Sequence, residues 1–245
     1  MIASYQHRQF DLSKPIEISI PLQEGPQVNC YYAPPFSTVA VEMGSFIGDV
    51  SRGGAVNYKN VFLNPHGNGT HTECYAHIAF TDLTMADALE RFHFTAQVIS
   101  VTPMPISGAG SVIRAEAFNV LEPGIEAVVI RTLPNENAKR TRQYSNTHPP
   151  YLEAEAALLL REKGVRHLLI DLPSIDPEVD GGALAAHRAF WRFPENPIPE
   201  ATITELIFVP DQAADGIYLL NLQVAAFRMD AAPSRPVLYP QVKHA

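Results

Sequence analysis

Residues 151–172 read YLEAEAALLLREKGVRHLLIDL, and their pattern indicates the class of fold. Its first part, residues 151–163, consists mostly of helix-forming residues and ends at Gly164, a residue type common just past helix ends. Residues 165–172 are mostly apolar, as expected of a buried strand. Upstream, residues 125–132 are a second apolar strand candidate. A strand, a helix and a strand in this order predict an α/β fold.

The rest of the chain predicts short strands and two more helices. Polar caps ahead of apolar residues at helical spacing predict a helix over 81–92, and residues 182–191 predict another that carries His187. β-branched or apolar segments predict strands at 38–43, 97–101, 202–209, 216–226 and 236–239. No internal repeat or obvious linker divides the 245 residues, so we expect a single domain over 1–245.

Residues 64–77 read NPHGNGTHTECYAH and place three histidines and one carboxylate within twelve residues. A single histidine is more often a satisfied polar side chain than a ligand, but this clustering favours a metal site. Imidazole and carboxylate groups bind zinc or manganese while leaving a coordination position open for water. The run lacks a His-Glu-x-x-His motif, which excludes a zinc-metalloprotease helix.

The spacing within this run allows its side chains to converge. On an extended stretch, alternation places His71 and Glu73 on one face. A helical turn beginning at Glu73 would then direct His77 back towards the carboxylate. His66 can join only if the glycines at 67 and 69 let the backbone fold over tightly.

Glu205 is the one charge within the apolar run 202–209. In a buried strand a carboxylate is expensive unless it is paired, protonated or bound to a cation. On an edge strand that faces water it needs no such explanation. The sequence leaves both alternatives open.

Composition limits the partners and the compartment. Hydrophobic residues make up 46% of the chain and charged residues 18%, which is typical of a folded protein. The formal net charge is -8 and the basic residues are scattered, so we expect neither nucleic acid nor membrane as a partner. The beginning of the sequence lacks the pattern of a secretory signal, which favours a cytoplasmic location. We therefore expect Cys30 and Cys74 to be free thiols, with Cys74 pointing away from its neighbours Glu73 and Tyr75.

Taken together, these residues resemble the cyclase family of metal-dependent hydrolases, which includes bacterial kynurenine formamidase and isatin hydrolase. The family hallmark His-x-Gly-Thr-His-x-Asp-x-Pro-x-His falls on residues 67–77. The resemblance implies a swivelling β/β/α fold, with a mixed sheet and flanking helices. It also implies a small-molecule substrate and a homodimer or homotetramer. Further segments match in order: Asp11 to Ser13, Val129 to Thr132, His148-Pro149, Asp171 to Asp176, His187-Arg188 and Glu205-Leu206.

The resemblance also implies roles for single residues. The metal would be zinc or manganese, in one or two sites. His71 and Glu73 match motif ligands, and His187 and Glu205 match the downstream pair that completes a second site. His77 matches the histidine assigned to proton transfer, and so is the catalytic candidate.

Three departures from the hallmark distinguish this chain. Gly67 stands where the first ligand histidine belongs, with His66 one place earlier, so the first ligand is displaced to His66 or is absent. Glu73 replaces the bridging Asp, and Tyr75 replaces the Pro. These changes indicate a divergent branch of the family.

The function expected from these features is hydrolysis of an amide-type bond in a small molecule, such as an aryl formamide or a cyclic amide. A metal ion would activate water, and His77 would move the proton. A lactonase or dehydratase on the same site, or a noncatalytic metal- or ligand-binding protein, are the alternatives. A serine hydrolase is disfavoured because no Gly-x-Ser-x-Gly motif is present. Substrate specificity is expected to lie in loops such as 133–150.

Overall fold

Four parallel strands form the centre of one large sheet in the computed structural model, which describes residues 1–107 and 110–242. The strands are β9 (His93–Val101), β12 (Ala127–Thr132), β14 (His167–Ile170) and β15 (Thr202–Glu205). They are almost entirely buried, because other elements cover both faces of the sheet. The strands predicted at 97–101, 125–132, 165–172 and 202–209 all lie here.

Antiparallel strands extend this centre on both sides. The full order is β17-β8-β15-β14-β12-β9-β16-β18-β3, which makes the sheet mixed. The added strands are β3 (Ile16–Glu17), β8 (His71–Glu73), β16 (Gly216–Asn221), β17 (Ala231–Pro233) and β18 (Val237–Pro240). The α/β prediction with a mixed sheet and flanking helices is therefore confirmed.

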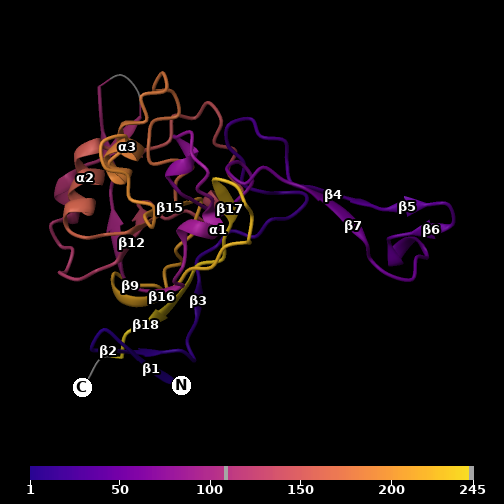
Figure 1. Cartoon of the computed structure of the whole chain (residues 1–245), viewed down its shortest axis with the longest axis horizontal. Coiled ribbons are helices and arrows are strands. Elements are labelled where there is room, and N and C mark those ends of the chain that lie inside the picture. Colours follow the sequence, from indigo (N-terminus) through magenta and orange to yellow (C-terminus); the bar gives the residue numbers. More distant parts are fainter. Residues whose placement is uncertain (108–109, 243–245) are drawn as a thin grey trace.

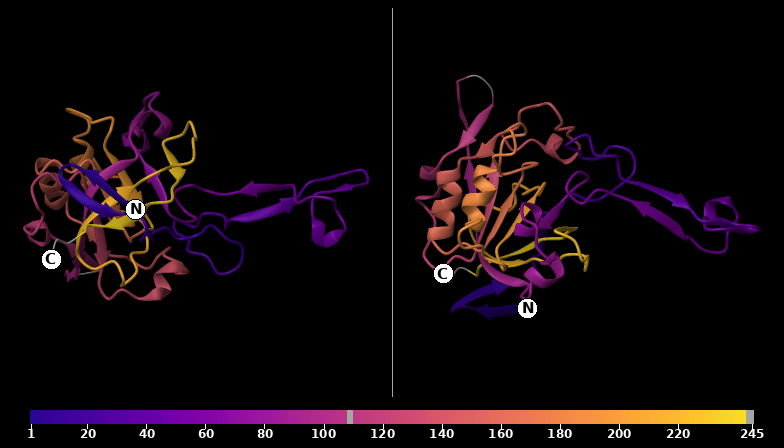
Figure 2. Two further views of the ribbon diagram at one scale, coloured as in Figure 1. Left: turned by 90° about the horizontal axis from the view of Figure 1, so that it is seen from below. Right: turned by 45° about the horizontal axis from the view of Figure 1, so that its top comes forward.

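Two helices, α2 (Ala154–Glu162) and α3 (Ala185–Trp191), pack side by side on one face of the sheet, as Figures 1 and 2 show. Between these helices and the strands lies an apolar core that includes Leu160, Phe190 and Trp191, all fully buried. A second core fills the opposite face of the sheet. The helices predicted at 151–163 and 182–191 are thus present, although residues 151 and 152 form the short strand β13.

The helix predicted over 81–92 is mostly absent. Only one turn, α1 (Met85–Ala88), forms there. The helix begins at Met85, four residues after the predicted start, where Thr84 and Asp87 make a capping box. The helix ends at once because Leu89 turns into the second core and the chain must enter β9 at His93.

A long arm leaves the body of the molecule between residues 37 and 62 (Figure 1). Its strands form two-stranded sheets that make no pairing with the large sheet. The predicted strand 38–43 falls in this arm and is interrupted at Val41. The arm comprises β4 (Ser37–Ala40), β5 (Glu42–Met43), β6 (Phe46–Ile47), the 3-10 helix η1 (Val50–Arg52) and β7 (Lys59–Phe62).

The remaining elements connect these parts. A hairpin of β1 (Ile2–Tyr5) and β2 (Arg8–Asp11) begins the chain, and a small sheet contains β10 (Met104–Pro105), β11 (Ser111–Ile113) and β13 (Tyr151–Leu152). The other 3-10 helices are η2 (Tyr75–His77), η3 (Ala115–Phe118) and η4 (Asn137–Arg140). Within residues 1–107 and 110–242, no helix has the length and apolar character needed to cross a membrane.

Candidate metal centre

The candidate site lies where β8 runs beside β15, on the side of the sheet that carries α3. His71 pairs directly with Glu205, and Glu73 pairs with Ile203. Opposite residues of an antiparallel pair share a face, and so do residues two apart on a strand. His71, Glu73 and Glu205 therefore project from the same face, as alternation predicts for the first two. His187 reaches them from α3 and is buried.

Glu205 ends a central strand that lies between β8 and β14, and its side chain is 4% exposed. The edge-strand alternative is therefore wrong. One carboxylate oxygen, Oε1, accepts a hydrogen bond of 3.0 Å from the Ile175 backbone N–H. The other oxygen, Oε2, lies 3.5 Å from His71 Nε2. A buried charge in this position requires compensation.

His71 presents a lone pair to this carboxylate. Its Nδ1 lies 2.9 Å from the Gly69 carbonyl oxygen, which can only accept, so Nδ1 carries the hydrogen. In the neutral ring Nε2 then has no hydrogen to donate. This atom is buried, and within the described residues it makes no hydrogen bond. A lone pair that faces a carboxylate in the interior is explained by a cation between them.

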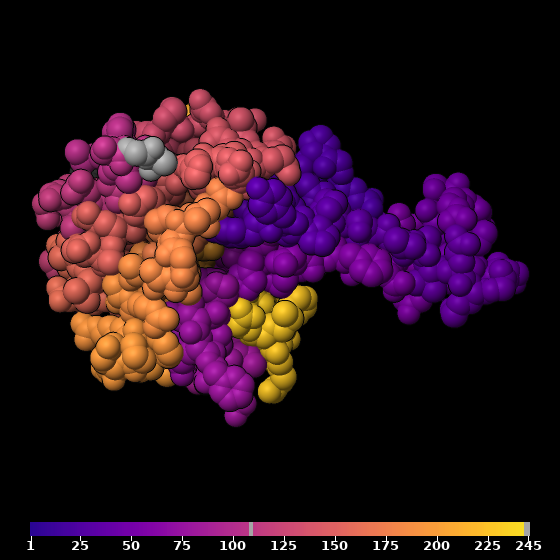
Figure 3. Space-filling model, turned by 90° about the horizontal axis from the view of Figure 1, so that it is seen from above, coloured from indigo at the N-terminus to yellow at the C-terminus, as the bar shows by residue number. Residues whose placement is uncertain are grey.

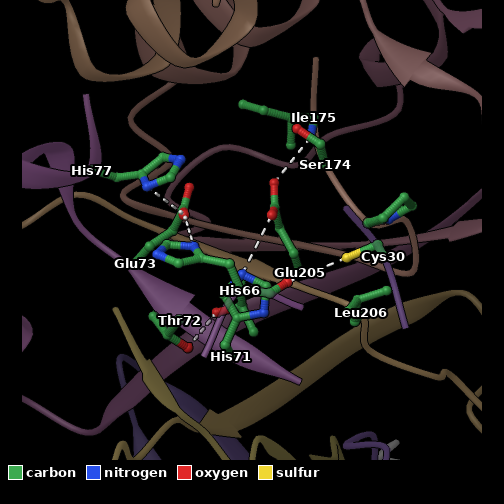
Figure 4. Close-up of polar contacts among 12 residues, drawn as sticks. Cys30, His66, His71, Thr72, Glu73, His77, Ser174, Ile175, Glu205 and Leu206 are labelled. Atoms are coloured by element: carbon green, nitrogen blue, oxygen red, sulfur yellow. Dashed lines mark hydrogen bonds and ion pairs between the residues drawn. The ribbon is translucent and has the colours of Figure 1, made fainter. Parts of the chain in front are cut away.

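The Glu73 carboxylate lies beside His66 and His77, as Figure 4 shows, and the residue is 1% exposed. Its Oε1 lies 3.0 Å from His187 Nε2. Its Oε2 lies 3.2 Å from His66 Nδ1 and 3.8 Å from His77 Nδ1. Neither approach to Oε2 has hydrogen-bond geometry, so this buried oxygen also lacks a hydrogen-bond partner in residues 1–107 and 110–242. The donor set and its two unsatisfied atoms fit a divalent cation.

Asp176 holds His187 in place. Its Oδ2 accepts from His187 Nδ1 at 2.5 Å and from the His187 backbone N–H at 3.1 Å, while Oδ1 accepts from the Ala186 N–H at 2.8 Å. These bonds fix the ring and direct Nε2 towards Glu73. The sequence marks Asp176 only as part of a segment that matches the family, and its supporting role comes from the structure.

Gly67 cannot carry the first ligand of the hallmark, because the position is closed. A Cβ at Gly67 would lie 2.2 Å from Ala33 Cβ and 3.3 Å from the Cys30 carbonyl oxygen. His66, one residue earlier, instead reaches the cluster and places Nδ1 3.2 Å from Glu73 Oε2. The structure therefore brings the displaced histidine into the site.

His77 approaches Glu73 from η2, a 3-10 helix that begins at Tyr75 rather than at Glu73. The predicted convergence with Glu73 occurs, at the 3.8 Å given above. The side chain is 31% exposed, so it stands at the boundary between the cluster and solvent. Cys74, which follows Glu73, is buried as a free thiol in the second core and points away from the cluster.

Asp230 is a member of the cluster that the sequence does not predict. Its Oδ2 lies 3.0 Å from His66 Nε2 and 3.1 Å from His77 Nδ1. It immediately precedes β17, which pairs with β8. No motif surrounds it, and 153 residues separate it from His77. Only the pairing of β17 with β8 could have indicated this position.

When no ion is bound, the histidines and carboxylates of the cluster shift one another's pKa. Burial disfavours charge on His66 and His187, but nearby carboxylates outweigh it and raise the pKa of each imidazole to about 10. For His66 the carboxylates are Asp230 and Glu73. Burial also opposes charge on His77, yet Glu73 and Asp230 raise its pKa above the usual value. Hydrogen bonds from His66 and His77 lower the pKa of Asp230.

The structure thus gathers all five predicted ligands and the catalytic candidate around one point. Three overlapping groups have ligand atoms that lie within 4.8 Å of one another: His66, His71 and Glu73; Glu73, His77 and His187; and His66, His77 and Asp230. Glu205 approaches the first two groups through His71 and His187. The assignment of each residue as ligand or acid/base stays a prediction.

A cavity of about 260 Å³ opens onto the cluster. Its walls include Tyr31, Ser174 and Leu184, together with His66, His77 and Glu205. The loop 133–150 lines a separate cavity of about 460 Å³. This loop is connected to the first cavity through Glu178, which lines that cavity and accepts hydrogen bonds from the backbone N–H groups of residues 146–148.

Known proteins of similar sequence and fold identify the family. The profile of the Cyclase family, described as "Putative cyclase", matches residues 10–177. Kynurenine formamidase from Bacillus cytotoxicus is 29% identical over 189 residues, covering 76% of this chain and 82% of that protein. The enzyme of the same name from Bacillus cereus strain ATCC 14579 is 28% identical over 189 residues, with the same coverage.

Solved structures support the same fold. Isatin hydrolase A from Labrenzia aggregata bound to benzyl benzoate superposes with a TM-score of 0.67 at 13% identity, covering 92% of this chain and 93% of that one. A potential metal-dependent hydrolase with cyclase activity gives a TM-score of 0.65 at 18% identity, covering 93% and 98%. With a profile match across well over half of its residues, the chain belongs to the Cyclase family.

Proposed function

We propose that this protein is a metal-dependent hydrolase that cleaves an amide-type C–N bond in a small molecule, such as an aryl formamide or a cyclic amide. The observation that carries the proposal is the buried lone pair of His71 Nε2, which faces Glu205 beside the unsatisfied Glu73 Oε2. Kynurenine formamidases and isatin hydrolase, as their names state, act on substrates of this class.

Five side chains would hold the ion or ions. His66, His71 and Glu73 supply one group of donors, and His187 and Glu205 supply another that shares Glu73. Zinc or manganese suits such imidazole and carboxylate donors. A divalent ion bound there supplies an activated water nucleophile and polarises the substrate carbonyl.

His77 is positioned to carry the proton. Its Nδ1 is directed at Asp230 and Glu73, which leaves Nε2 as the atom that can exchange a proton with a substrate. The residue lines the cavity and is partly open to solvent. An imidazole placed in this way can accept a proton from the nucleophile and deliver it to the leaving nitrogen.

The cavity favours a small substrate. At about 260 Å³ it lies slightly below the roughly 300–1,000 Å³ common for drug-sized ligands. Tyr31 and Leu184 give it partly apolar walls, while the buried donors stand at its base. This arrangement suits a single aromatic or heterocyclic ring that carries an amide.

Replacement of His71 by alanine tests the function. Zinc or manganese content and turnover on a panel of aryl formamides, isatins and lactones are measured for His71→Ala, for the wild type and for His93→Ala, a control histidine outside the cluster. The expected result is loss of both ion and turnover in His71→Ala alone. Retention of both would refute the proposal. If the wild type cleaves lactones only, the protein is a lactonase. If the ion-loaded wild type is inactive across the panel, the protein is a binding protein.

We further propose that a second copy of this chain covers the arm, giving a homo-oligomer. Figure 3 shows the arm standing clear of the body. A two-stranded hairpin alone is marginally stable in water. Several large apolar residues of the arm are more than half exposed: Val39, Met43, Val50, Val56, Tyr58, Val61 and Phe62. Residues 37–62 match the roughly 20–30 residues that each side contributes to a standard interface.

The charges of the arm support an apolar partner. Arg52 pairs with Glu42, and Lys59 pairs with Asp49. The arm therefore has no excess charge that would attract an acidic or basic partner. A copy of the same chain is always present at equal concentration, and twofold symmetry buries both arms in one step.

Sedimentation velocity tests this assembly. Val61→Lys on the arm is expected to shift the wild-type oligomer towards monomer. Val120→Lys, at an apolar residue on the body that is 65% exposed against 54% for Val61, is the control and should leave the oligomer intact. A monomeric wild type at micromolar concentration, or an unchanged Val61→Lys oligomer, would contradict the assignment.

A further inference from the structure

Two histidines of the cluster are each held between two carboxylates. His187 places one ring nitrogen on Asp176 and the other on Glu73, at 2.5 and 3.0 Å. His66 repeats the arrangement with Asp230 and Glu73, at 3.0 and 3.2 Å. Histidine ligands of metal ions commonly donate their second ring N–H to such a carboxylate. Asp230 thus contacts the second ring nitrogen of His66 in the same way that Asp176 contacts that of His187.

The backbone fixes Asp230 in this position. Its carbonyl oxygen accepts from the Cys74 backbone N–H at 3.0 Å, next to Glu73. The following residue, Ala231, pairs with Glu73 across β17 and β8. The Asp230 carboxylate is therefore tied to the same strand that carries His71 and Glu73. Its side chain is 29% exposed, so the oxygen that contacts the histidines is only partly screened by water.

A single oxygen of Asp230 contacts both His66, which lies one place before the hallmark's first histidine, and His77, which matches its last one. Oδ2 accepts from His66 Nε2 and from His77 Nδ1, and the two rings lie 4.4 Å apart between centroids. With Nε2 of His66 donating to this oxygen, Nδ1 is the nitrogen that could bind an ion beside Glu73. Once Nδ1 of His77 donates to it, Nε2 is the nitrogen left for proton exchange.

We propose that Asp230 is a positioning residue that converts the displaced His66 into a metal ligand and sets the tautomer of His77. The inference rests on the proposed function and deepens it. Because Gly67 is closed by Ala33, an imidazole must come from position 66, and the second ring nitrogen of His66 then needs a hydrogen-bond partner. Asp230, supplied by a segment far along the chain, provides that support.

A double-mutant cycle on ion affinity tests the inference. Zinc affinity is measured by competition with a chromophoric chelator for the wild type, Asp230→Asn, His66→Ala and the double variant. Loss of a carboxylate that supports a ligand typically weakens affinity 10–100-fold. The expected result is a loss of that size in Asp230→Asn, and less than a twofold further loss when Asp230→Asn is added to His66→Ala. Asp230→Ser is measured in parallel, so the conclusion does not depend on one variant folding.

Two outcomes would overturn the inference. Unchanged affinity in Asp230→Asn and Asp230→Ser would show that Asp230 supports no ligand. Asp230→Asn could instead weaken zinc affinity as much in the His66→Ala variant as in the wild type, and also reduce the number of ions bound per chain. That result would show that Asp230 is itself a ligand. Asp82→Asn, an exposed aspartate outside the cluster, is the matched control and should bind like the wild type.

Turnover gives a second readout that a merely structural role would not move. At saturating zinc, Asp230→Asn is expected to lower kcat with little change in KM, because His77 would lose its orientation while the cavity stays intact. An unchanged kcat would overturn the part of the inference that concerns His77. Failure of the proposed function is distinguishable, because it shows in the wild type and in His71→Ala, as absent turnover or retained zinc, whatever the Asp230 variants do.

Discussion

Replacement of Gly67 by alanine should reveal why the first histidine of the hallmark is displaced. The new methyl group would lie 2.2 Å from Ala33 Cβ, whereas carbon atoms in contact prefer about 3.5–4.0 Å. The two segments cannot separate freely. The Cys30 N–H donates to the Gly67 carbonyl, and the Ala33 N–H donates to the Cys30 carbonyl, each at 3.1 Å.

Relief of this overlap requires a shift of more than an ångström in hydrogen-bonded backbone. Overpacking of this kind typically costs about 1–3 kcal/mol. For a chain of this size the same cost corresponds to roughly 2–12 °C in Tm. Zinc affinity should fall as well, because His66 adjoins the displaced residue and a site loosened by about 1 Å loses function.

Urea unfolding of the ion-free protein measures the cost for Gly67→Ala, Ala33→Gly and the double variant. Ala33→Gly alone should cost about 0.5–1 kcal/mol from the flexibility of glycine. The double variant removes the overlap, so it should be more stable than the sum of the single costs predicts. Strictly additive costs, or a Gly67→Ala protein as stable as the wild type, would refute the explanation.

Two further predictions concern buried ionisable groups outside the site. Burial lowers the pKa of His167 to about 3, so the stability gained from its neutral ring is complete above pH 6.5 and is lost as pH falls towards 3. Between pH 7 and pH 5 the free energy of unfolding, measured with urea, should therefore fall by about 2 kcal/mol more for the wild type than for His167→Asn. Equal decreases for the two proteins would contradict this. Lys139→Met leaves the buried Asp171 carboxylate without its partner at 2.8 Å, which should cost about 3–5 kcal/mol. Calorimetric unfolding compares this variant with Lys163→Met, at an exposed lysine, which should change stability by less than about 0.5 kcal/mol. Similar costs for the two variants would be inconsistent with a buried pair.

The sequence predicts the parts of this molecule that depend on local pattern. Apolar β-branched runs identify the central strands, and alternation places His71 and Glu73 on one face. The metal cluster is visible because its donors are close together in the chain and match the hallmark of a family to which the chain belongs.

The features that the sequence does not predict depend on distant contacts. The helix expected over 81–92 stops after one turn because β9 follows directly. The closure of position 67 requires Ala33, which lies in a different loop. Asp230 joins the cluster only because β17 pairs with β8, and no local sequence pattern predicts that pairing.

The most direct test of a divalent ion at this site is anomalous diffraction from crystals grown with zinc or manganese. A bound ion should give a peak at roughly 2.0–2.2 Å from both His71 Nε2 and Glu73 Oε2, two buried atoms of the cluster that lack hydrogen bonds within the described residues. Absence of a peak between these atoms, or a peak confined to His66, His77 and Asp230, would contradict the proposed ion site.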